Sequence, residues 1–187
     1  MTLKEMKTKT LALIEELNPN SEYLTDDPDI ATKHNEVINQ IMFEMARIRK
    51  IPRYVQMEVT ESMVLQFPDI ERETGNEIYQ VIQIDGVAYE SRANGTVFKI
   101  RESGTAEIDC YVYPERITDK TKDNAYEFEL PPDVLEVMPY GIAADLLKSD
   151  ESANFGQVYA TRYAEMKNEI DIRYMTATIS VEGGYDV

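Results

Sequence analysis

Residues 27–59 read DPDIATKHNEVINQIMFEMARIRKIPRYVQMEV, and the spacing of the apolar residues changes within this stretch. In its first two thirds they recur every three or four positions, the period of an α-helix. From Val55 they recur at every second position, the period of a β-strand. Asp27 followed by Pro28 is a favourable helix start, and Pro52 predicts where the helix ends. The stretch therefore predicts one long helix followed directly by a β region.

Three other segments have helical spacing. Residues 3–17 place leucine, isoleucine and methionine side chains on one helical face. A second pattern begins at Pro131 and continues to Leu147, and a third covers residues 151–173. Together with the helix that begins at Pro28, these segments predict about four helices.

Between Val55 and Tyr113 the apolar residues alternate with polar ones, which predicts strands. Asp85-Gly86 and Asn94-Gly95 are dipeptides that two-residue hairpin turns favour, because both central positions of such a turn need a positive φ. We therefore expect two successive β-hairpins in this region.

These patterns predict an α+β fold, in the form of a helical bundle of about four helices with an inserted antiparallel β-hairpin region and an extended C-terminal arm. The predicted helical domain comprises residues 1–52 and 131–173, and the inserted β region comprises residues 53–130. The arm comprises residues 174–187. It has too few apolar groups to fold alone, so we expect it to be disordered in the free protein and ordered on a partner.

The 187-residue chain carries 35 acidic and 19 basic side chains, which gives a formal net charge of −16. This excess leaves few cations to displace counterions from phosphates, so tight nucleic-acid binding is not expected. The single cysteine, Cys110, cannot form an internal disulfide or a cysteine-based zinc site. No apolar run approaches the roughly 20 residues of a membrane helix, and residues 1–7 show no secretion signal. We expect a soluble protein that is made in the cytoplasm.

The sequence offers little from which to build a catalytic site. His34 is the one histidine, and its place on the apolar face of the predicted helix favours a structural role, either packed or half-exposed. The glycines form neither a dinucleotide-binding nor a triphosphate-binding loop. The acidic run from Asp26 to Asp29 is a candidate cation site, but it lacks the calcium-loop pattern and is accounted for by helix capping. We therefore predict no catalytic residue, no bound metal and no cofactor.

Four basic residues gather where the long helix is predicted to end. They are Arg47, Arg49, Lys50 and Arg53. Cations at a helix C-terminus are stabilised by the helix dipole, so capping is one interpretation. The other is a contact with an acidic partner, or with passing phosphates, that is repeated around an assembly. We take these four residues as candidates for partner binding.

The C-terminal arm is a second candidate for partner binding. An alternating segment can add a strand to the edge of a sheet on another protein, where backbone hydrogen bonds supply the affinity. The candidate residues are Thr176, Thr178, Ile179, Val181 and Tyr185.

Three short motifs carry a resemblance to a known family. They are YVYPERI at residues 111–117, LPPDVL at residues 130–135 and GIAADLLKSD at residues 141–150, and a helical segment with tyrosines follows at residues 155–170. In this order, and with two helices before them, they resemble the head-tail adaptor proteins, or connectors, of tailed bacteriophages. Residues 55–107 match this family least.

The resemblance implies a structural, non-enzymatic protein of the virion neck. Such a protein forms a ring, typically of twelve copies, which docks beneath the portal protein and provides the platform for the tail or nozzle proteins. DNA passes through the ring without specific binding. An acidic wall suits this role because it repels the phosphate backbone. Neither a membrane nor a cofactor is implied.

Two other functions fit the same residues. A neck stopper or tail-terminator protein would differ only in the partner that it contacts. A metal-dependent hydrolase that uses carboxylates alone belongs to a different class, and a tight stoichiometric metal site would distinguish it.

Overall fold

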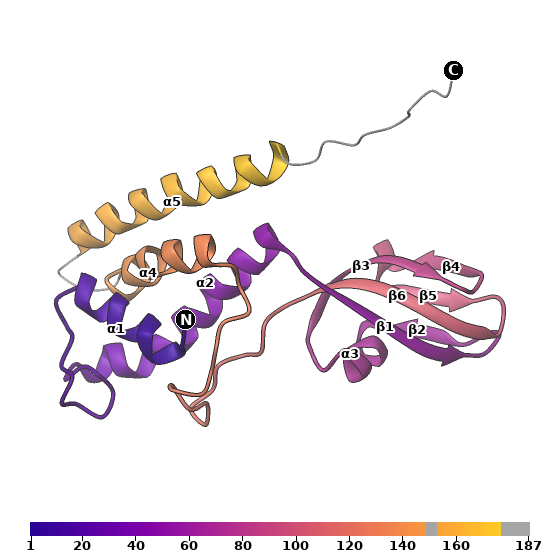
Figure 1. The fold of residues 1–187 in the computed structure, drawn as a ribbon, viewed down its shortest axis with the longest axis horizontal. Helices are drawn as coiled ribbons and strands as arrows, with labels where there is room; N and C mark the ends of the chain where they lie inside the picture. Colours follow the sequence, from indigo (N-terminus) through magenta and orange to yellow (C-terminus); the bar gives the residue numbers. More distant parts are fainter. Residues whose placement is uncertain (149–152, 177–187) are drawn as a thin grey trace, which may run out of the picture. The chain divides into compact units, whose positions relative to one another are not determined.

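The computed structural model describes residues 1–148 and 153–176, and the chain divides into two compact units (Figure 1). The first unit comprises Met1–Ile41 together with Asp119–Val187, and the second comprises Met42–Thr118. The chain passes from the first unit into the second within one long helix. The domain limits at residues 52 and 131 stay a prediction.

Helices make up most of the described part of the first unit. Thr2 begins the first helix with a capping box, in which its side chain accepts the N–H of Glu5 and the Glu5 carboxylate accepts the N–H of Thr2. Asp27 caps the second helix, because its Oδ1 atom accepts the N–H groups of Asp29 and Ile30. The helices are α1 (Leu3–Leu13), α2 (Pro28–Arg49, whose first part lies in this unit), α4 (Pro132–Leu146) and α5 (Ala153–Thr176).

α4 is the central helix of this unit, and it packs against both α1 and α5 (Figure 1). α4 and α5 approach closely where Gly141 faces Tyr163, since a Cβ atom at Gly141 would lie 2.9 Å from the tyrosine ring. Burial of apolar side chains between these helices is the main source of their stability. The buried side chains include Leu3, Met6, Leu11, Val134, Met138, Ile142 and Ile170.

The second unit contains two three-stranded antiparallel sheets, with the strand orders β1-β6-β3 and β2-β5-β4. A short helix, α3, packs against β1, β2 and β3. Every second residue of the central strand β6 is buried, from Ala106 to Val112, as one covered face of a sheet requires. The elements are β1 (Ile51–Val59), β2 (Val64–Gln66), α3 (Phe67–Thr74), β3 (Ile78–Asp85), β4 (Tyr89–Arg92), β5 (Val97–Ile100) and β6 (Gly104–Val112).

The predicted architecture, a bundle of about four helices with an inserted hairpin region, is wrong. The described residues contain five α-helices, and the chain between α2 and α4 forms two sheets and α3. The structure is a mixed α+β fold. The first sheet is built around β6, which pairs with β1 along its whole length, so that Ile51 lies opposite Val112 and Val59 opposite Gly104. These partners are far apart in the sequence, and no local turn signal reveals their pairing.

One of the two predicted hairpin turns closes a hairpin. The connection from Ala93 to Thr96 joins the paired antiparallel strands β4 and β5, so a hairpin is confirmed here. The connection has four residues rather than the two predicted, and Asn94 and Gly95, with φ of 56° and 82°, lie at its centre. The hairpin predicted at Asp85-Gly86 is wrong, because the chain passes there from β3 in one sheet to β4 in the other. Gly86 has a φ of 80°, and a Cβ atom on it would lie 2.4 Å from the carbonyl oxygen of Thr105. A close approach to β6 therefore explains this glycine.

The long helix predicted from Pro28 is confirmed as α2, whereas the C-terminal boundary differs from the prediction. α5 extends to Thr176, so residues 174–176 are helical and do not belong to an extended arm. The other candidate residues of the arm, Thr178, Ile179, Val181 and Tyr185, lie outside the described residues. Their role in partner binding stays a prediction.

Gly86→Ala should destabilise the second unit more than Gly95→Ala. A positive φ costs an alanine about 1 to 2 kcal/mol at either position. At Gly86 the new Cβ atom would also collide with a backbone oxygen, whereas at Gly95 nothing lies within 4 Å of it. We expect Gly86→Ala to lower the free energy of unfolding by about 3 kcal/mol or more, measured by urea denaturation. Equal losses in the two variants would contradict the close approach.

Candidate functional site

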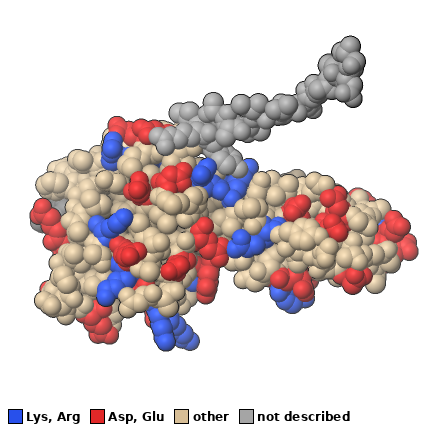
Figure 2. Space-filling model, viewed as in Figure 1, with Lys and Arg blue, Asp and Glu red and all other residues tan. Residues whose placement is uncertain are grey.

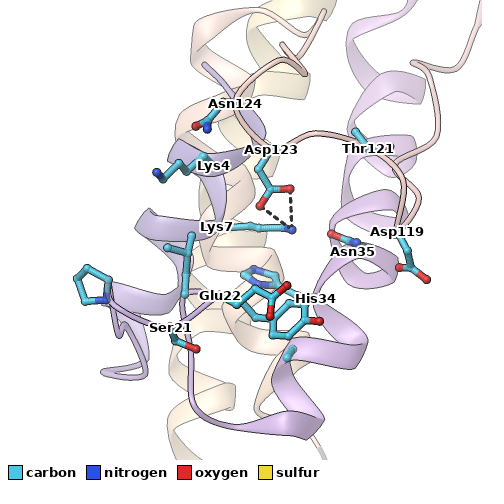
Figure 3. Close-up of a pocket in the computed structure, with 14 residues that line it drawn as sticks. Lys4, Lys7, Ser21, Glu22, His34, Asn35, Asp119, Thr121, Asp123 and Asn124 are labelled. Carbon is cyan, nitrogen blue, oxygen red and sulfur yellow. Dashed lines mark hydrogen bonds and ion pairs between the residues drawn. The ribbon is translucent and has the colours of Figure 1, made fainter.

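A polar pocket of about 630 Å³ lies in the first unit (Figure 3). It is formed by the connection between α1 and α2, the first turns of α2 and the chain that precedes α4. α1 lines one side through Lys4 and Lys7. The pocket therefore brings together residues 19–24 and 119–124, which are widely separated in the sequence.

An ion pair between Lys7 and Asp123 holds two of these segments together. The Lys7 ammonium donates to both carboxylate oxygens of Asp123 at 3.0 Å, and the lysine side chain is only 13% exposed. The backbone N–H groups of Leu3 and Lys4 donate to the carbonyl oxygens of Tyr126 and Asp123. The segment before α4 is thus bound to α1 both by charge and by backbone hydrogen bonds.

His34 borders this pocket and is almost completely buried, with 2% of its surface exposed. The packed role predicted for it is confirmed. Its Nε2 atom, like the Oδ1 atom of Asn35, has no hydrogen-bond partner among the described residues. Burial, with a smaller contribution from the charge of Lys7, lowers the pKa of His34 to about 3, so the imidazole is neutral at pH 7.

Two carboxylates at the pocket, those of Glu22 and Asp119, have no hydrogen-bond or ion-pair partner in the described part of the chain. A second cavity, of about 510 Å³, shares Asp119 with the pocket and is also lined by Asp26 and Asp27. Both aspartates already have hydrogen-bond partners, since Asp26 accepts a hydrogen bond from Asn18 and Asp27 caps α2. The capping predicted for this acidic run is confirmed at Asp27.

The pocket is therefore rich in hydrogen-bond acceptors, which are two carboxylates, an amide oxygen and an imidazole nitrogen. Over residues 1–148 and 153–176, no group of histidine, cysteine and acidic side chains is arranged to hold a metal ion. Sequence reasoning misses this site because most of its residues come from connections that show no apolar period. The one feature of the sequence that points to this pocket is its single histidine, His34.

The four basic residues predicted to bind a partner lie in the second unit, at the end of α2 and the start of β1. Figure 2 shows Lys and Arg side chains gathered at the end of α2. The structure adds Arg116, whose guanidinium lies 5.0 Å from the ring centre of Phe43 on α2. Sequence reasoning misses Arg116, because it follows β6 and nothing local marks it as a neighbour of α2. We call Arg47, Arg49, Lys50, Arg53 and Arg116 the basic cluster.

Aromatic rings position the cations of the basic cluster. The Nε atom of Arg47 donates to the hydroxyl of Tyr113 at 2.5 Å, and the guanidinium lies 5.4 Å from the centre of the same ring. The ammonium of Lys50 lies 5.0 Å from the centre of the Tyr111 ring. Cations held over aromatic faces are stabilised by the negative potential of those faces. Helix capping by these residues stays a prediction.

The two units differ in charge. Residues 1–41 and 119–187 carry 22 acidic and 10 basic side chains, a net charge of −12. Residues 42–118 carry 13 acidic and 9 basic side chains, a net charge of −4. Most of the excess negative charge therefore belongs to the unit that contains the pocket, and the basic cluster belongs to the other unit.

Comparisons with known proteins identify no family. No protein-family model matches the chain, and no curated protein matches it. Within the described ranges, no helix is long and apolar enough to cross a membrane.

The stability of the first unit should depend on pH through His34. An unfolded histidine has a pKa near 6.5 and the buried one has a pKa of about 3, so between these values only the unfolded state takes up the proton. The contribution of His34 is fully present above pH 6.5 and is lost as the pH falls, by up to about 1.4 kcal/mol per pH unit. Urea denaturation of the wild-type chain and of His34→Gln across this range measures the loss.

The other titratable groups are common to both chains, so the difference between their stability curves isolates His34. Parallel curves would contradict its buried, neutral state.

Arg47→Gln should lower the free energy of unfolding by about 1 kcal/mol, because it removes a hydrogen bond to a buried tyrosine and a cation–π contact. Arg72→Gln is the matched control in the same unit. The Arg72 side chain is 72% exposed and pairs with Asp69 at 3.4 Å, so its loss should change stability very little. Urea denaturation measures both variants, and equal effects would show that the aromatic contacts of Arg47 add nothing.

Proposed function

We propose that this chain is a structural protein of the virion neck of a tailed bacteriophage. It forms a ring beneath the portal protein, with twelve copies as the expected number. The ring joins the phage head to the tail or nozzle proteins and lines the channel through which DNA passes. The resemblance of residues 111–117, 130–135 and 141–150 supports the proposal, as do the surface of α5 and the charge of the chain.

The exposed face of α5 is the observation that carries the proposal. Phe155 and Val158 lie about one helical turn apart, and they are 68% and 65% exposed although both are large and apolar. On the same helix Tyr163 and Ile170 are buried against the core. Contiguous apolar surface of this kind is typical of a protein contact. A contact between neighbouring subunits of a ring would cover them.

The charge of the chain suits the wall of a DNA channel. A net charge of −16 on each copy repels phosphates, so DNA can slide past without binding. The same charge opposes the association of free copies. Docking on the portal protein offsets this repulsion by holding the copies together. A neck stopper or a tail-terminator protein would share these properties and differ in its partner.

The gene should be required for joining heads to tails. In a phage genome that encodes this chain, we expect a deletion to leave DNA-filled heads and separate tails in electron micrographs, because the platform between them is lost. The wild-type chain supplied from a plasmid should restore infectious particles. Complete tailed particles from the deletion would overturn the proposal.

The same assay tests the exposed face of α5. The double variant Phe155→Ser, Val158→Ser should fail to restore infectious particles, because it removes the apolar contact without touching the core. Ile82→Ser, which changes an exposed apolar residue of the second unit, is the matched control and should restore them. Restoration by the double variant would exclude these two residues from the subunit contact.

The isolated chain should be monomeric or weakly associated at micromolar concentration and low ionic strength. Its charge of −16 acts over about 30 Å at 0.01 M salt, so copies repel one another before they touch. Light scattering after size exclusion measures the mass, and one copy has a mass of 21.5 kDa. A stable ring of the free chain under these conditions would contradict the role of the portal protein in assembly.

A further inference from the structure

The pocket of the first unit presents acceptors that nothing in the described chain uses. The Nε2 atom of His34 and the Oδ1 atom of Asn35 are buried without hydrogen bonds among the described residues, and the carboxylates of Glu22 and Asp119 have no partner there. Glu22 and Asp119 are exposed, so an occupant that carries positive charge would meet their carboxylates first. A hydrogen-bond donor that entered more deeply would also satisfy the buried atoms of His34 and Asn35.

The cations of the pocket do not oppose such an occupant. The charge of Lys7 is neutralised by Asp123, which it contacts through both carboxylate oxygens. Figure 3 shows Lys4 beside Asn124, on the opposite side of Lys7 from His34. Burial lowers the pKa of His34, so its neutral imidazole does not repel a cation. An anion, by contrast, would meet the two unpartnered carboxylates.

The basic cluster of the second unit presents suitable donors. Arg47 uses its Nε atom to bind Tyr113, and its other N–H groups have no partner in the described part of the chain. The ammonium of Lys50 contacts the Tyr111 ring and nothing else that is described. Both side chains are already held by aromatic rings, so little conformational entropy is lost when they bind a partner.

We propose, on the basis of the ring described above, that the pocket of one copy receives the basic cluster of the neighbouring copy. The two copies then use different surfaces, which makes the contact head-to-tail. Such contacts form a closed ring when the rotation that relates one copy to the next divides a full turn evenly. The charges favour this arrangement, because two first units, each with a net charge of −12, repel one another when they meet directly.

A zero-length carbodiimide, which links an amine to a carboxylate in direct contact, tests the proposal. Isotope-labelled and unlabelled wild-type chains are mixed at high protein concentration and about 0.1 M salt, which screens the long-range repulsion between copies but leaves contacts at short range. We expect mass spectrometry to find peptides that join Lys50 of one copy to Glu22 or Asp119 of a differently labelled copy. Absence of these mixed pairs would overturn the proposal.

Charge reversal separates this contact from effects of net charge. The acidic-side variant is Glu22→Lys, Asp119→Lys, and the basic-side variant is Arg53→Glu, Arg116→Glu. Each alone should weaken association, measured by sedimentation equilibrium, by about tenfold or more, because like charges then face one another. A mixture of the two variants should associate again, because each reversed surface finds its complement on the other chain.

Two control variants make the same changes of net charge elsewhere. Glu16→Lys, Glu165→Lys changes exposed residues of the first unit, and Arg72→Glu, Arg92→Glu changes exposed residues of the second unit. Both should associate like the wild-type chain apart from the general effect of net charge. A cooperative thermal unfolding transition close to that of the wild-type chain shows that each variant is folded.

Loss in each reversed variant and recovery in their mixture would support the proposal. Unchanged association in either variant would overturn it, as would a mixture that fails to recover. A basic-side variant that associates normally but no longer docks on the portal protein would assign the basic cluster to the portal instead. The gene deletion tests the neck function separately, so the two proposals can fail independently.

Discussion

The junction between α1 and the segment that precedes α4 depends on the ion pair between Lys7 and Asp123. The pair joins α1 to the segment that returns from the second unit, 116 positions further along the chain. Because the Lys7 side chain is largely buried, its ammonium cannot be left without a partner at low cost. Backbone hydrogen bonds from Leu3 and Lys4 strengthen the same junction. The pair also sets the electrostatics of the pocket, since loss of Asp123 would leave an uncompensated ammonium beside His34.

The sequence predicts elements that a local period defines and misses those that depend on distant partners. α2 is predictable because one of its faces is buried at every turn, and the β4–β5 hairpin is predictable because its turn residues are adjacent. The central place of β6 is not predictable, because antiparallel pairing between distant strands leaves no local mark. α3 has only eight residues, and Phe67 and Ile70 are its only large apolar side chains, too few to establish a helical period in the sequence. The pocket is missed for the same reason, since Glu22 and Asp119 lie in connections.

In the second unit one aromatic side chain links the fold to the basic cluster. Tyr113 follows β6 and is buried, with its ring centre 4.8 Å from that of Phe43 and 4.9 Å from that of Tyr79. The Tyr79 hydroxyl donates to the carbonyl oxygen of Ala46, so these rings also contact the backbone of α2. The packing that joins the sheet to α2 thus places Arg47 as well. A cation that is ordered in this way serves the fold and remains available to a partner.

In the proposed ring, the uneven charge of the chain would reconcile the mutual repulsion of copies with their assembly. Repulsion between whole copies acts at the range of the Debye length, about 10 Å at 0.1 M salt, and it grows with each copy added. Attraction between a basic cluster and an acceptor pocket acts at contact, where water is excluded and each pair is stronger. A scaffold that brings copies within contact distance therefore lets the attraction between cluster and pocket exceed the repulsion between whole copies. Free copies at low concentration remain separate. A chain with its net charge of −16 spread evenly would lack this short-range attraction, and the scaffold alone would have to supply all of the binding energy.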